Sequence, residues 1–98
     1  MIYEWDEAKR LKNLEKHGID LIRGVQVYEA ECKVTLESHR SHENRWMDIA
    51  GIDGVIMVLS LTYTRRKDTV RFISLRPASR KERRIYQWEK SSDTPAKS

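Results

Sequence analysis

The strongest local signal in the chain is a pair of β-rich runs separated by a turn dipeptide. Arg45 to Ile52 and Val55 to Thr64 are the two runs, and Asp53-Gly54 lies between them. Because aspartate and glycine tolerate positive φ angles, this dipeptide is typical of a two-residue hairpin turn. The first five residues of the second run are all apolar, which is typical of a central strand covered on both faces. We therefore expect a tight hairpin at the centre of the fold.

Helix signals precede this β region. Asp6 is placed to cap a helix that runs to His17 and stops at Gly18, where glycine favours a left-handed ending. Asp20 can cap a second helix that ends near Ala30, and a short strand is expected over residues 33–37. Two consecutive helices are therefore expected before the sheet.

The first of these helices shows a three-residue repeat of apolar positions. Ala8, Leu11 and Leu14 share one face, and we expect that face to pack on the core. Lys9, Asn13 and Lys16 form a polar stripe, which we expect to face away from the core, with His17 leaning towards it.

A third long strand and a last helix are predicted after the hairpin. The run from Val70 to Leu75 is strand-like and ends before Pro77. Ser79 and Glu82 then have the spacing of a capping box, which starts a helix that we expect to end before Ser91.

Together these elements predict an α+β fold, with two N-terminal helices packed on a small antiparallel sheet and a C-terminal helix. A chain of 98 residues forms one domain, which we place at residues 1–90, followed by a polar, disordered tail at 91–98. There is no apolar run of about 20 residues and no signal-peptide pattern. We therefore expect a cytoplasmic protein that does not associate with membranes.

Basic charge is concentrated in one quarter of the chain. The net charge is +4, but residues 1–64 carry eight basic and eleven acidic side chains, whereas residues 65–90 carry ten basic and three acidic ones. A polyanion partner needs several cations on one surface, so this pattern favours nucleic acid. A solvated basic helix fits the composition equally well.

Two blocks of residues resemble the BrnT family of toxins. The first block is Trp5-Asp6-Glu7-Ala8-Lys9-Arg10 with Asn13 and Lys16-His17-Gly18-Ile19, and the second is Tyr63-Thr64-Arg65 with residues 71–83. Glu43, Arg45, Gly51 and Gly54 match a weaker middle block, so that the resemblance spans residues 3–86. Residues 29–40 match little, and Phe72 stands where isoleucine is common.

The resemblance implies a RelE-like fold and an endoribonuclease that inhibits translation by cleaving RNA. It also implies neutralisation by a cognate antitoxin, BrnA. Because the chain shows no DNA-binding element of its own, we expect operator DNA to be bound only by the toxin-antitoxin complex.

Metal-independent RNA cleavage needs a base for the 2′-hydroxyl, cations for the phosphorane and an acid for the leaving oxygen. Arg76, at the end of the last strand, and Arg65, at the preceding turn, are the candidate phosphate binders, with a salt bridge as the structural alternative for Arg76. Glu43, His17, His39 and His42 are the titratable acid-base candidates, together with Lys9, and of these Lys9, His17 and Glu43 are retained as site residues. Further contacts to RNA are expected from Arg71, Arg80 and Arg83. Strand alternation places Arg71 and Arg76 on opposite faces.

No cofactor or metal is expected. His39 and His42 lie beside Glu43 in a polar loop, but the loop supplies neither a scaffold nor a fourth ligand. Cys32 is not needed, because the RNA provides its own nucleophile. Two alternatives stay open: a non-catalytic nucleic-acid-binding module, and an interaction protein that binds an acidic or amphipathic segment.

Overall fold

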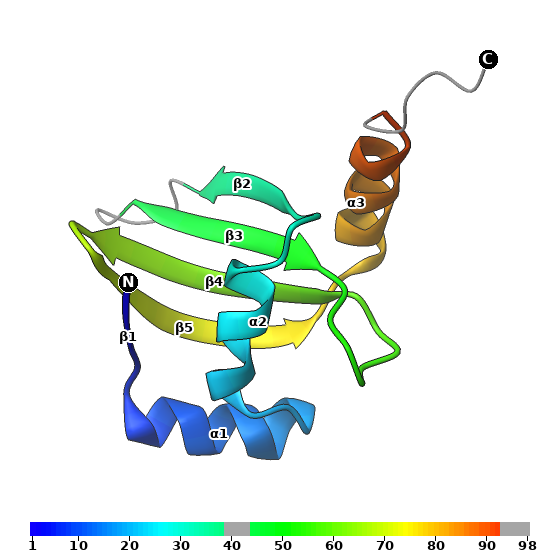
Figure 1. Ribbon diagram of the computed structural model, residues 1–98. Coiled ribbons are helices and arrows are strands. Elements are labelled where there is room, and N and C mark those ends of the chain that lie inside the picture. The colour runs from blue at the N-terminus through cyan, green and yellow to red at the C-terminus, as the bar shows by residue number, and fades with distance from the viewer. Residues whose placement is uncertain (39–43, 93–98) are drawn as a thin grey trace.

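The computed structural model describes residues 1–38 and 44–92, which form a five-stranded sheet with helices packed against it (Figure 1). The strands are β1 (Ile2–Glu4), β2 (Val34–Ser38), β3 (Arg45–Ala50), β4 (Leu59–Arg66) and β5 (Thr69–Pro77). The helices are α1 (Glu7–His17), the 3-10 helix η1 (Leu21–Arg23), α2 (Gly24–Tyr28) and α3 (Arg80–Ser92).

The sheet has the strand order β1-β5-β4-β3-β2. The three pairs from β2 to β5 are antiparallel, but β1 pairs with β5 in parallel. The expected α+β class is confirmed, whereas the expectation of a purely antiparallel sheet is wrong. The difference arises because the first extended residues of the chain add to the free edge of β5.

The connection between β3 and β4 is longer than the sequence suggested. Ala50 pairs with Leu59, so residues 51–58 form a loop and the predicted two-residue hairpin is wrong. Asp53-Gly54 does make a turn, but inside this loop, and Ile56 is fully exposed. The loop is held by other contacts: Arg23 donates a hydrogen bond to the Asp53 carbonyl at 2.9 Å.

Helix α1 has the predicted ends but not the predicted buried face. The Asp6 carboxylate accepts a hydrogen bond from the Ala8 amide at 2.8 Å, and Gly18 ends the helix with φ of +70°. Leu11 and Leu14 are 58% and 42% exposed, whereas Asn13 is only 7% exposed. The polar stripe, and not the apolar one, therefore supplies the residue that α1 buries.

Asn13 is buried because it completes the edge of the sheet. Its Nδ2 donates to the carbonyls of Leu75 at 2.7 Å and Ile19 at 2.9 Å, and its Oδ1 accepts from the Leu75 amide at 3.0 Å. Strand β1 reaches only as far as Arg71 along β5, so it cannot pair with Leu75. One side chain therefore replaces the missing strand.

The remaining helices differ from the expectation at their ends. The second predicted helix is a 3-10 turn followed by five α-helical residues, and it ends at Tyr28. The capping box of α3 is confirmed by reciprocal bonds between Ser79 and Glu82 at 2.8 and 3.1 Å. Helix α3 continues to Ser92, so the first two residues of the expected tail are helical, and residues 93–98 lie outside the described part.

The two faces of the sheet are covered differently. One face packs against η1 and α2 around a core that includes Leu21, Val27, Leu61 and Phe72. On the other face a smaller cluster forms where Tyr86 of α3 meets the sheet. Helix α3 packs mainly on the β2–β3 side and also reaches β4 and β5 through Glu82, which bonds to Ser60 and Arg76, so much of this second face is left without a helix.

The first core also contains a buried polar hub. Asp48 is fully buried, and its carboxylate accepts hydrogen bonds from Lys33 at 2.7 Å, Thr35 at 2.7 Å and Tyr63 at 2.9 Å. Burial and the neighbouring carboxylate raise the pKa of Tyr63. The hub joins β3 to both of its neighbouring strands.

We predict that Asn13→Ala destabilises the protein by about 3 kcal/mol, because the buried amide and carbonyl of Leu75 lose their partner. Urea unfolding would measure the loss. Leu11→Ala, on the exposed side of the same helix, should change stability by less than about 0.5 kcal/mol. Equal effects of the two substitutions would contradict the role given to Asn13.

Candidate functional site

A β-bulge in β5 determines which side chains point to the face of the sheet that α3 leaves largely uncovered, which we call the open face. Thr62 pairs with Ser74 but Tyr63 pairs with Phe72, so Ile73 is an extra residue in β5. Residues paired across antiparallel strands point to the same face. Arg71 pairs with Thr64 and Arg76 with Ser60, and these two partners lie four residues apart on β4. Arg71 and Arg76 therefore share one face, and the expectation of opposite faces is wrong.

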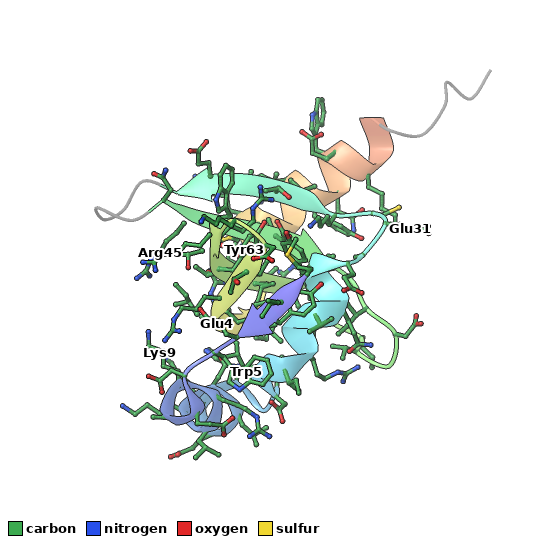
Figure 2. All side chains as sticks on the ribbon, turned by 60° about the vertical axis from the view of Figure 1, so that its left-hand side comes forward. Glu4, Trp5, Lys9, Glu31, Arg45 and Tyr63 are labelled. Atoms are coloured by element: carbon green, nitrogen blue, oxygen red, sulfur yellow. The ribbon has the colours of Figure 1, made fainter. Side chains whose placement is uncertain are left out.

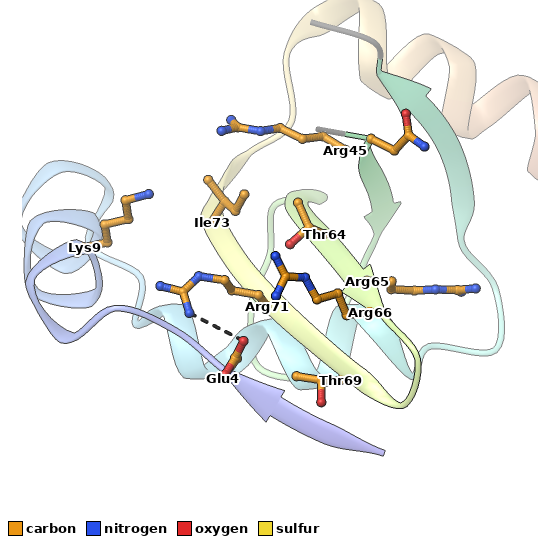
Figure 3. A pocket seen from close by; sticks show the side chains of 10 residues that line it. Glu4, Lys9, Arg45, Thr64, Arg65, Arg66, Thr69, Arg71 and Ile73 are labelled. Atoms are coloured by element: carbon orange, nitrogen blue, oxygen red, sulfur yellow. Dashed lines mark ion pairs between the residues drawn. The ribbon is translucent and has the colours of Figure 1, made fainter. Parts of the chain in front are cut away.

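A hollow of about 590 Å³ lies on this open face. Residues from β1, α1, β4, β5 and the start of β3 line it: Glu4, Lys9, Asn44, Arg45, Thr64, Arg65, Arg66, Thr69, Arg71 and Ile73. Figure 3 shows the side chains of Lys9, Arg45, Arg66 and Arg71 around the hollow. In the same view the Arg65 side chain points away, as strand alternation requires for the neighbour of Arg66.

The hollow is strongly cationic. Among the described residues, Lys9 and Arg66 have no ion-pair partner, and Arg71 pairs with Glu4 at 3.4 Å. Both members of that pair are about half exposed, so the pair remains accessible to a ligand. Five basic residues line the hollow, and the side chains of all but Arg65 point towards it beside Glu4. Such a cluster of cations attracts anions.

The structure brings together only some of the predicted site residues. Lys9, Arg65 and Arg71 line the hollow, although the end of the Arg65 side chain points away from it. Arg76 and His17 do not line it, and Arg80 and Arg83 belong to α3. Glu43, His39 and His42 lie outside the described residues.

The sequence did not predict three charged residues of the hollow: Glu4, Arg45 and Arg66. Arg45 was part of the family resemblance but was given no role. Arg66 could have been preferred to Arg65 by alternation from Thr64, but only once the limits of β4 were known. No sequence signal distinguished Glu4.

Arg76 forms a salt bridge at the other end of β5. Its guanidinium donates to both oxygens of Glu82, at 2.9 and 2.8 Å. The same carboxylate accepts from the Ser60 hydroxyl at 2.8 Å and from the Ser79 amide. The bonds from Arg76, followed by those from Ser79 and Ser60, lower the pKa of Glu82 to about 2 despite its partial burial. This geometry matches the structural alternative for Arg76.

His17 lies at the C-terminal end of α1, within the electrostatic influence of Arg76. Burial lowers the pKa of His17, and the charges of Lys16 and Arg76 lower it further. A depressed pKa favours the neutral imidazole at neutral pH.

The chain matches the family model described as a ribonuclease toxin, BrnT, of type II toxin-antitoxin systems, over residues 5–82. The chain belongs to the BrnT family. A search among curated proteins finds no match. As a type II toxin, a BrnT protein has an antitoxin as its partner.

The structure explains much of the opening BrnT motif by packing. Trp5 stacks on Phe72 with ring centroids 6.2 Å apart, Asp6 caps α1, and Asn13 completes the sheet edge. Lys9 belongs to the same motif but makes no side-chain hydrogen bond or ion pair with any described residue. Figure 2 shows Lys9 on α1, on the same side of the molecule as Glu4 and Arg45. Its place in the motif therefore calls for a functional explanation.

The described residues contain neither a metal-ligand cluster nor a membrane-spanning helix. No group of three His, Cys, Asp or Glu residues in ranges 1–38 and 44–92 could hold a metal ion. None of the helices in these ranges is long and apolar enough to cross a bilayer.

We predict that Glu82→Gln lowers the free energy of unfolding by about 2 kcal/mol at pH 7, because Arg76 loses its charged partner. The pKa of Glu82 is lower in the folded chain than in the unfolded one, where it is about 4.3. The stabilisation is therefore complete above about pH 5 and is lost as the pH falls towards 2. Denaturant unfolding at several pH values would measure it.

Glu89→Gln is the control for this prediction, because Glu89 is exposed on the same helix. A difference between wild type and Glu82→Gln that persisted unchanged at pH 2 would contradict the ion-pair explanation.

Proposed function

We propose that the hollow is the active site of a metal-independent endoribonuclease. The observation that carries this proposal is the convergence of Lys9, Arg45, Arg66 and Arg71 on one open face of the sheet. Guanidinium groups bind phosphate oxygens in a bidentate manner, and clustered cations stabilise the extra negative charge of a phosphorane. Family membership supplies the ribonuclease activity.

In the proposed reaction the 2′-hydroxyl of the RNA is the nucleophile. A base removes its proton, O2′ attacks the adjacent phosphorus, and the bond from phosphorus to O5′ breaks. The products are a 2′,3′-cyclic phosphate and a 5′-hydroxyl. Arg66 and Arg71 would hold the non-bridging oxygens, and Lys9 would protonate the leaving O5′.

Glu4 is the carboxylate placed to act as the base within the described part of the hollow. Its ion pair with Arg71 holds it beside the cation that would bind the phosphate. Glu43, the base candidate from the sequence, lies outside the described residues, so its role stays a prediction. His17 and Arg76 remain candidates only if the RNA extends along β5.

We also propose a RelE-like arrangement and a BrnA-like antitoxin. The sheet with α1 and α2 on one side and α3 on the other supports the first. Membership of the BrnT family supports the second.

Purified protein, freed of antitoxin, should cleave a defined RNA in excess chelator and leave 2′,3′-cyclic or 3′-phosphate ends. Arg71→Ala should lower the cleavage rate by on the order of 100-fold or more, because one phosphate-binding cation is lost. Lys12→Ala removes an exposed cation of α1 that does not line the hollow, and should have little effect.

Undiminished cleavage by folded Arg71→Ala would remove the hollow from the mechanism. Retained RNA binding without any cleavage, with or without ribosomes, would instead favour the non-catalytic binding module. If the cleavage rate of Arg76→Ala falls by more than its fraction of folded protein does, Arg76 takes part in cleavage.

The isolated toxin should not bind its operator DNA specifically, whereas the toxin-antitoxin complex should. This expectation follows because the described fold offers a basic hollow but no element that reads base edges. A mobility-shift assay with operator and scrambled DNA would measure it, and specific binding by the toxin alone would contradict it.

A further inference from the structure

The outward side of α3 carries an exposed tryptophan next to arginines. Arg80, Arg84 and Trp88 are each four residues apart, so they form one row with a spacing of about 6 Å. Trp88 is 72% exposed. Arg83 and Gln87 flank the row, and the five side chains line a shallow groove along the helix. We call Arg80, Arg84 and Trp88 the α3 row.

This row is not needed to hold α3 on the sheet. The opposite side of the helix does that, through the buried ring of Tyr86 and the ion pair of Glu82 with Arg76. Within the described part of the chain, Arg80 and Arg84 form no ion pair. An exposed indole beside two uncompensated guanidiniums leaves both apolar surface and charge available to a partner.

We propose that the α3 row is a docking site for an acidic segment of the antitoxin. The segment would place carboxylates on Arg80 and Arg84 and an apolar side chain on the indole of Trp88. The partner class follows from family membership and does not depend on the RNA chemistry proposed above.

The chemistry of the row favours a protein over RNA. Tryptophan and arginine are the residues most enriched at the energetic centres of protein interfaces, whereas lysine is depleted there. The row is also distinct from the hollow, because the two are lined by different residues and no residue of α3 lines the hollow.

A docking site outside the hollow has a consequence for neutralisation. An antitoxin held on α3 would present its remaining residues to the hollow at a high effective concentration. The α3 row would then determine affinity for the antitoxin, while the hollow would keep its side chains for RNA.

Arg84→Glu with Trp88→Ala tests this proposal. Titration calorimetry with the purified cognate antitoxin should show binding weaker by about 30-fold or more, the usual effect of removing an interface hot spot. RNA cleavage should stay within about threefold of wild type. In cells the variant should remain toxic when the antitoxin is co-expressed. Lys12→Glu, with the same change of charge as Arg84→Glu on exposed α1, is the control and should bind normally.

Arg71→Ala separates this proposal from the proposed function, because binding to the antitoxin is measured without any cleavage. The dissociation constant of Arg71→Ala for the antitoxin should lie within about threefold of that of the wild type. The single variants Arg84→Ala and Trp88→Leu, checked by circular dichroism, provide milder changes at the same exposed positions and should each weaken binding.

Wild-type antitoxin affinity in the folded double variant would overturn the proposal. Retained antitoxin binding with weakened binding of a single-stranded uridine oligonucleotide would also overturn it, and would assign the row to RNA.

Discussion

The pairing of Asn13 with the backbone of Leu75 is the interaction on which the rest of the arrangement depends. Strand β1 covers only the first residues of β5, and an uncovered strand edge exposes unpaired amides and carbonyls. The Asn13 amide supplies one donor and one acceptor to that edge, as a strand would. This contact fixes α1 along β5, and Lys9, one turn earlier, is thereby brought to the hollow.

The open face of the sheet owes its chemistry to two further constraints. The bulge at Ile73 turns Arg71 and Arg76 to the same side, which regular alternation would not do. Helix α3 then packs on the β2–β3 side of this face through Tyr86, and reaches Ser60 and Arg76 through Glu82. At the opposite ends of β4 and β5, Arg66 and Arg71 line the hollow, to which α3 contributes no residue.

A single carboxylate links this open face to α3. The Glu82 carboxylate accepts hydrogen bonds from the Ser79 amide, the Ser60 hydroxyl and the Arg76 guanidinium. One group therefore connects the start of α3 to β4 and β5. Breaking such a pair leaves a partly buried charge, which explains a structural need for an arginine in this motif. BrnT membership alone therefore does not make each motif arginine catalytic, and the contacts of each must be considered separately.

The sequence by itself determined the α+β class, the caps at Asp6, Gly18 and Ser79, the basic C-terminal quarter and, through two motif blocks, the family. Caps follow from the sequence because their hydrogen bonds join residues at most four positions apart. Only the tertiary structure decided that α1 buries Asn13 instead of Leu11, that the side chain of Arg66 points towards the hollow while that of Arg65 points away, and that Glu4 lines it. Those outcomes depend on contacts between residues far apart in the sequence, up to 62 positions for Asn13 and Leu75. Local periodicity does not predict such contacts.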